Sequence, residues 1–137
     1  MIPVNNSTKH NPRMGRFGDC FSACLSSILE TAVPHVLHDG CDGEQKLRRL
    51  DAFLKPLCLS YVEIPIRERN VWDALDWGGY ITAENGIHYL LLGNTKDDTG
   101  HYVVAHKNEI AHNPNEKAQI VKPIDDFYWI GFVTRRT

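Results

Sequence analysis

The chain has 137 residues and a formal net charge of −2; 42% of its residues are hydrophobic and 23% are charged. This length suits one domain, spanning residues 1–137, that buries a hydrophobic core without disulfide or metal support. The nearly neutral charge without a basic cluster argues against nucleic-acid binding, and no apolar run is long enough to cross a membrane.

The start of the chain and its cysteines indicate where the protein works. The first six residues lack the basic and apolar regions of a secretory signal. Four cysteines without an export signal are expected to be free thiols rather than a disulfide framework. We therefore expect a cytoplasmic protein.

The first predicted element is a helix that opens on a cysteine and runs from Cys20 to about Thr31. Residues 1–17, before it, are polar and irregular and are expected to form an arm on the surface or against the domain. Asp19 is a good N-cap, and Val33-Pro34 stops the helix. Apolar residues recur at helical spacing along it: Phe21, Cys24, Leu25, Ile28 and Leu29.

The middle of the chain predicts two further helices around one strand. Gly43 to Leu54 has a helical apolar face and is closed by Lys55-Pro56. Residues 57–66 are rich in strand-forming residues. Asn70 to Trp77 is a short helix with Asn70 as its cap, and we expect Gly78-Gly79 to end it.

The remainder predicts short strands separated by turn residues, which is typical of an antiparallel meander. These runs are Tyr80–Ala83, His88–Gly93, His101–Ala105, Glu109–His112 and Tyr128–Thr134. Because helices come first and strands follow, the sequence predicts an α+β domain with the N-terminal cysteine-bearing helix packed on an antiparallel sheet.

Cys20 is the candidate nucleophile. It falls in the first helical turn, where the partial positive charge of the helix end favours the thiolate and so lowers the thiol pKa. Cys24 lies one turn further, inside the apolar stripe, and is better explained as a small core residue.

His101 and Asn113 are the candidate base and its orienting partner. His101 heads a strand after the turn at residues 96–100, and Asn113 precedes Pro114 at the end of the next strand. A hairpin through Lys107-Asn108 would bring Asn113 near His101. The amide could then hold the imidazole in the tautomer that accepts the thiol proton, and we predict a thiolate–imidazolium pair with Cys20.

Five short stretches form a recognisable set: Val4-Asn5-Asn6-Ser7, Gly18 to Leu29, Val33-Pro34-His35, His101 to Val104 and His112-Asn113-Pro114. Together they resemble the papain-like fold of cysteine peptidases. The nearest branch is the bacteriocin-processing peptidases that cleave double-glycine leaders. A group of small uncharacterised phage and bacterial papain-like proteins is more similar still.

The resemblance implies a papain-like domain in which Cys20 is the nucleophile, His101 the general base and Asn113 the orienting residue. It implies a protein or peptide substrate and no cofactor. Where the family has a glutamine that donates to the oxyanion, this chain has Asn6, which is one methylene shorter. Losing such a donor costs roughly a hundredfold in rate or more, so the departure argues for weak peptidase activity. Asn113 replaces the family's aspartate, and an asparagine also serves papain-like enzymes.

A zinc site is an alternative use of the cysteines. Cys20 and Cys24 are followed by His35, His38 and Cys41, but the spacing matches no familiar zinc signature. Using Cys24 as a ligand would also remove it from the apolar stripe of the helix. We therefore expect no metal.

Other candidates fit the pattern less well. His88 is a rival base, but it precedes an apolar run and lacks an Asn-Pro partner. Trp72, Trp77 and Trp129 are far from any Gly-rich phosphate loop, so we expect them in the core or in a cleft wall rather than around a cofactor.

Three functions remain open. The first is a papain-like thiol hydrolase that cleaves a peptide or isopeptide bond. The second is a transglutaminase- or deamidase-type acyl transferase that uses the same acyl-enzyme. The third is a papain-like binding protein with little or no turnover, such as a phage factor acting on a host protein in the host cytoplasm; Asn6 favours this third function. None of the three needs a nucleic acid or a membrane.

Overall fold

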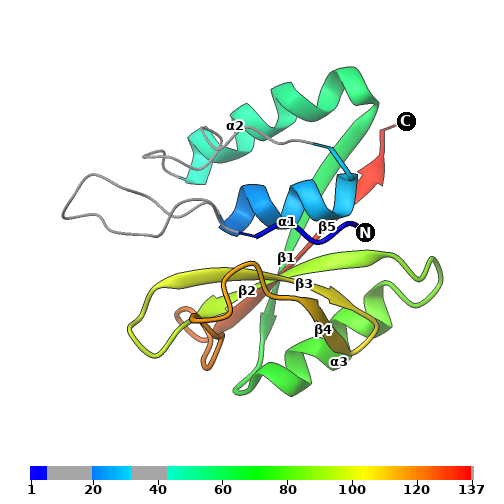
Figure 1. Ribbon diagram of the computed structural model, residues 1–137. Helices are drawn as coiled ribbons and strands as arrows, with labels where there is room; N and C mark the ends of the chain where they lie inside the picture. The colour runs from blue at the N-terminus through cyan, green and yellow to red at the C-terminus, as the bar shows by residue number, and fades with distance from the viewer. Residues whose placement is uncertain (6–19, 32–42, 137) are drawn as a thin grey trace, which may run out of the picture.

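The computed structural model describes residues 1–5, 20–31 and 43–136, with residues 43–46 described for their backbone only (Figure 1). The elements are α1 (Cys20–Leu29), α2 (Gly43–Leu54), the 3₁₀ helix η3 (Lys55–Leu57), β1 (Leu59–Arg67), α3 (Val71–Ile81), β2 (His88–Asn94), β3 (Gly100–His106), β4 (Glu109–His112) and β5 (Phe127–Arg135). Over these residues, no helix combines the length and the apolar character that crossing a membrane requires.

The described strands form one sheet in the order β1-β5-β2-β3-β4, and every neighbouring pair is antiparallel. The predicted meander is present as β2-β3-β4. Strand β5 departs from it, because it inserts between β1 and β2. Its nearly continuous apolar run, residues 127–133, suits a central strand that is covered on both faces.

Helices cover both faces of this sheet, so the domain has three layers (Figure 1). One core joins α1 and α2 to one face, through residues such as Phe21, Leu50 and Tyr102. A second core joins α3 to the other face, through residues such as Leu75 and Val103. The predicted α+β arrangement, with the cysteine-bearing helix on an antiparallel sheet, is therefore confirmed.

Helix α1 is buried from Cys20 to Ser27. Its central contact is Phe21, whose ring centre lies 4.8 Å from that of Tyr102 and 5.6 Å from that of Tyr61. The helix ends at Leu29, because Glu30 adopts a left-handed backbone conformation with φ of 57°. The predicted end near Thr31 was two residues too long.

The end of α3 corrects the sequence-based prediction. Asn70 caps the helix as expected, since its side chain accepts from the Asp73 backbone N–H at 2.9 Å. The helix does not stop at Gly78-Gly79, however, and the predicted strand Tyr80–Ala83 is wrong because α3 continues to Ile81. The ring of Tyr89 lies against Gly78 so closely that a Cβ there would overlap it. Gly78 therefore permits close helix–sheet packing instead of ending the helix.

The N-terminal residues 1–5 pack across α1. The Ile2 N–H donates to the Ser27 carbonyl at 3.0 Å, and the Val4 N–H donates to the Ser27 hydroxyl at 2.9 Å. The Val4 carbonyl accepts from Nε2 of His112, in β4, at 2.9 Å. The arm thus ties α1 to the strand that leads to Asn113. The rest of the predicted arm lies outside the described residues.

Candidate functional site

Cys20 is the first residue of α1 and is 6% exposed. It belongs to the core cluster that packs α1 onto the sheet, together with Tyr102 of β3. A negative charge on Cys20 contributes to raising the pKa of Tyr102, after burial and the Glu63 carboxylate, which indicates that the two groups are close. The expected cap, Asp19, lies outside the described residues.

Cys24 has the surroundings of an inert core residue. It is fully buried one turn after Cys20. Burial raises the pKa of the Cys24 thiol well above its ordinary value, and the proximity of Cys20 raises it further. Cys24 therefore stays a thiol and does not compete as a nucleophile.

His101 lies at the beginning of β3 and is 4% exposed. The turn before it is fixed by its own backbone: the Thr95 N–H donates to the Thr99 carbonyl at 2.9 Å, and the Asp98 N–H donates to the Thr95 carbonyl at 3.1 Å. Asp98 adopts a left-handed conformation with φ of 61°, which an aspartate tolerates in a turn. The turn thus fixes the backbone that leads into His101.

His101 and Asn113 are directly hydrogen-bonded, with His101 Nε2 2.7 Å from Asn113 Oδ1. The predicted proximity of the two residues is therefore confirmed. Asn113 Nδ2 donates to the Ala118 carbonyl at 2.7 Å, so the amide orientation is determined and Oδ1 is the atom that faces His101. Because Oδ1 can only accept, Nε2 carries the proton, and the Nδ1 lone pair of the neutral ring is left to accept another.

Burial lowers the pKa of His101 below its ordinary value of 6.5, and the hydrogen bond that the ring donates to Asn113 opposes this shift. The neutral imidazole is therefore the favoured form near neutral pH. This direction suits a general base that takes up a proton during reaction better than a resting imidazolium in an ion pair.

Cys20 and His101 approach β3 from different faces of the sheet. Tyr102 belongs to the core beneath α1, and the next residue, Val103, belongs to the core beneath α3. His101 pairs with Gly93, where a Cβ would meet Ile120 and Tyr128 of the core beneath α3. Since side chains alternate along a strand, His101 points towards this second side, where Asn113 holds it. The structure thus unites His101 with Asn113, whereas Cys20 packs on the face of the sheet where the next residue, Tyr102, lies.

A partly buried polar pair beneath α1 was not anticipated from the sequence. The Tyr102 hydroxyl donates to both carboxylate oxygens of Glu63, in β1, at 3.4 Å. Burial, followed by the Glu63 charge, raises the pKa of Tyr102 well above its ordinary value, so the phenol keeps its proton. The available signal was Glu63 itself, an acidic residue within an apolar strand run.

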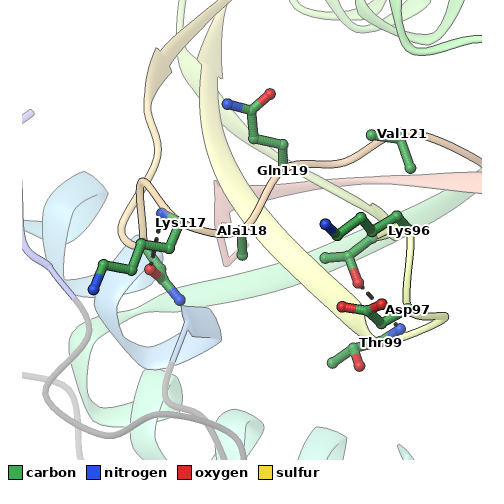
Figure 2. A pocket seen from close by; sticks show the side chains of 9 residues that line it. Lys96, Asp97, Thr99, Lys117, Ala118, Gln119 and Val121 are labelled. Atoms are coloured by element: carbon green, nitrogen blue, oxygen red, sulfur yellow. Dashed lines mark hydrogen bonds between the residues drawn. The ribbon is translucent and has the colours of Figure 1, made fainter.

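A pocket of about 510 Å³ lies between the β2–β3 turn and the segment that follows Asn113 (Figure 2). Figure 2 shows Lys96 and Asp97 on one wall and Lys117 on the other. Each wall contains hydrogen bonds within its own segment. For example, the Lys117 N–H donates to Asn115 Oδ1 at 3.2 Å. The pocket was not predicted, because it forms between segments distant in sequence that flank His101 and Asn113.

The rival base His88 lies at the other end of the β2–β3 hairpin, opposite His106. The two rings stack with centres 4.4 Å apart, and Nε2 of His106 donates to the Gly86 carbonyl at 3.0 Å. Burial, followed by the charge of His106, lowers the pKa of His88. His88 therefore pairs with another histidine at the end of the hairpin remote from His101.

The tryptophans correct a prediction. Trp72 is 67% exposed and Trp77 is 44% exposed, both on α3, so neither is a core residue. Trp77 does line a shallow pocket, together with Tyr80. Trp129 is partly buried in β5.

Three ligands of the alternative zinc site, His35, His38 and Cys41, lie outside the described residues. Asn6, at the position that the resemblance assigns to an oxyanion donor, also lies outside them. Within the part of the chain that the structure describes, no three histidine, cysteine, aspartate or glutamate residues are grouped to hold a metal ion.

The pairing of His101 with Asn113, at the start of the strand whose next residue packs beneath the cysteine-bearing helix, is thus the main chemical feature of the site. Comparison of the chain with protein families, with curated proteins and with solved structures finds no match.

Proposed function

We propose that this chain is a papain-like thiol hydrolase that cleaves a peptide or isopeptide bond, with Cys20 as nucleophile, His101 as general base and Asn113 as the residue that orients it. The observation that carries the proposal is the 2.7 Å bond between His101 Nε2 and Asn113 Oδ1. It belongs to a strand that packs against the helix opening on Cys20.

The mechanism follows from the tautomer of His101. With Nε2–H held by Asn113, Nδ1 takes the proton of the Cys20 thiol, and the thiolate attacks the substrate carbonyl carbon. The imidazolium then returns the proton to the leaving amine as the C–N bond breaks. Water, activated by the same Nδ1, hydrolyses the thioester and regenerates the thiol.

The surroundings support these roles. The lowered pKa of His101 keeps the ring neutral and ready to accept a proton. The pocket between the β2–β3 turn and residues 115–121 is lined by residues that flank His101 and Asn113 in sequence, and it supplies a hollow for part of a substrate chain. Cys24 stays protonated and buried, so one thiol on α1 is left for chemistry.

A papain-like binding protein without turnover is the second candidate. The observation that favours it is the alternation in β3, which directs His101 to the side away from α1. In that case the pair of His101 and Asn113 anchors the segment at residues 113–118, and Cys20 is a core residue at the start of a helix.

Iodoacetamide labelling against pH separates the two candidates. Cys58 is exposed, so the experiment uses a Cys58→Ser background, with peptide mapping to assign the label. We expect Cys20 to dominate labelling at pH 7, because the helix end favours its thiolate and the neutral His101 ring takes up the thiol proton. His101→Ala should slow this labelling about tenfold and change its pH dependence, whereas His88→Ala should leave both unchanged.

The opposite result is equally informative. If Cys20 labels slowly and with the same pH dependence in the His101→Ala variant, the hydrolase proposal fails and the binding protein is favoured. Cys20→Ser identifies the labelled thiol, because the fast phase must disappear in it.

A further inference from the structure

The outer face of α3 carries large aromatic side chains in solvent. Trp72, Trp77 and Tyr80 are exposed, and Tyr80 is 76% exposed. The inner face of the same helix, by contrast, buries Ala74, Leu75 and Gly78 against the sheet. Large exposed aromatic side chains gathered on one helix can mark a binding site.

Two of these rings form a corner. The ring centres of Trp77 and Tyr80 are 6.0 Å apart and their planes are perpendicular. The indole N–H of Trp77 donates to the carboxylate of Glu68, which lies before α3, at 2.9 Å. This bond fixes the indole by its polar edge, so its face remains available to a ligand.

The corner belongs to a pocket of about 470 Å³ whose charged lining is entirely acidic. The lining residues are Glu68, Asp73, Asp76, Trp77 and Tyr80. Pockets of roughly 300–1,000 Å³ are large enough for small ligands and side chains. Aromatic faces are electrostatically negative, so the rings and the carboxylates attract the same kind of group, a cation.

We propose that this α3 pocket docks the arginine or lysine side chain of a basic peptide segment in a partner protein. The cation would lie against the faces of Trp77 and Tyr80, with Asp76 and Asp73 as counter-charges. Trp72 extends the aromatic surface along the helix, where the flanking residues of an extended segment can pack. The pocket is on the α3 side of the sheet and Cys20 is on the α1 side, so the inference does not rest on the proposed hydrolase activity.

The test uses the full chain and a fluorescein-labelled decapeptide of alternating glycine and arginine, titrated by fluorescence anisotropy. Asp76→Asn and Tyr80→Ala should each weaken binding about five- to tenfold, because they remove a counter-charge and a ring face. Tyr80→Phe keeps the ring and should bind within about twofold of the parent. Glu84→Gln is the matched charge control, because Glu84 is exposed after α3 and outside the pocket.

Several outcomes would overturn the inference. One is a lack of saturable binding to the arginine peptide, and another is equal binding of a peptide in which citrulline replaces arginine. Equal weakening by Glu84→Gln would show general charge attraction and no pocket. Self-association abolished by Tyr80→Ala without peptide binding would identify a second copy as the occupant, and binding to phosphatidylcholine vesicles alone would identify a lipid headgroup.

Discussion

The ionisation of His101 is set by two opposing neighbours. Burial disfavours the charged ring, and the bond to Asn113 favours it, with burial the stronger influence. Asn113 can play this part because its amide is oriented by the Ala118 carbonyl. An uncharged partner therefore fixes the tautomer without stabilising the imidazolium as strongly as a carboxylate would.

Substitutions at Asn113 should move the pKa of His101 in opposite directions. Asn113→Ala removes the bond that raises the pKa and should lower it further. Asn113→Asp adds a negative charge beside the ring and should raise it above that of the parent chain. The pKa values can be read from the ring carbon shifts of His101 in an NMR pH titration, with His88 as the internal control. An unchanged His101 pKa in both variants would show that the bond has no electrostatic effect.

The same lowered pKa predicts a pH-dependent stability. Unfolded His101 titrates near its ordinary value of 6.5, and the folded form titrates below it, so the unfolded state binds more protons between the two pKa values. The free energy of unfolding should therefore be fully retained above about pH 6.5 and should fall as the pH drops towards the folded pKa. Urea unfolding at pH 7.5 and 5.5 measures this loss.

His101→Gln should lose less stability between the two pH values than the parent chain. The pKa of His88 is shifted in the same direction, but His88 is only partly buried, so His88→Gln should change the difference less. An identical pH dependence in His101→Gln and the parent would contradict the prediction.

Among the elements, α3 shows how one packing contact overrides local signals. Its two adjacent glycines indicate a helix end, yet the helix continues past them because Tyr89 occupies the space beside Gly78. The Tyr89 hydroxyl then donates to the carbonyls of Leu75 and Lys107, at 3.1 and 2.6 Å. The tyrosine thereby joins α3 to the β3–β4 turn.

Gly78→Ala should destabilise the chain, although alanine is the better helix former by about 1 kcal/mol. The added Cβ overlaps the ring of Tyr89, and overpacking of this kind costs about 1–3 kcal/mol. Thermal or urea unfolding measures the change. The double variant Gly78→Ala with Tyr89→Leu should cost less than the sum of the single variants, since the overlap is then gone. If Gly78→Ala were stabilising, the close contact would not exist.

In the molecule as a whole, the N-terminal arm connects segments that are far apart in sequence. Val4 is bonded to Ser27 in α1 and to His112 in β4, and the Met1 ammonium pairs with Glu30 at 2.9 Å. The Ser27 hydroxyl in turn donates to the Ala23 carbonyl at 2.9 Å. One buried serine thus links the arm to the helix that carries Cys20.

Ser27→Ala should release Val4 from the helix. Its amide loses the hydroxyl acceptor, so hydrogen exchange at Val4 should accelerate and the free energy of unfolding should fall by about 1 kcal/mol. The Ile2 amide bonds to the Ser27 carbonyl, which the substitution keeps, and serves as the internal control. Ser60→Ala, in β1, is the matched control variant. Unchanged exchange at Val4 would show that the bond does not hold the arm.

The sequence by itself determined the elements whose signals are local. The bounds of α2 agree with the prediction, α1 and the β strands match to within about two residues, and the Asn70 cap is present, because periodicity and capping depend on neighbours along the chain. It also indicated that His101 and Asn113 would meet, since a short hairpin connects them.

The tertiary structure decided what depends on distant residues. The insertion of β5 into the sheet, the passage of α3 through Gly78 and the face of β3 on which His101 lies are each set by contacts between separate elements. The sequence likewise did not determine that Trp72 and Trp77 are exposed, because an aromatic residue has the same local pattern in a core and at a binding surface. Only the packing of α3 on the sheet fixed which of its faces remained in water.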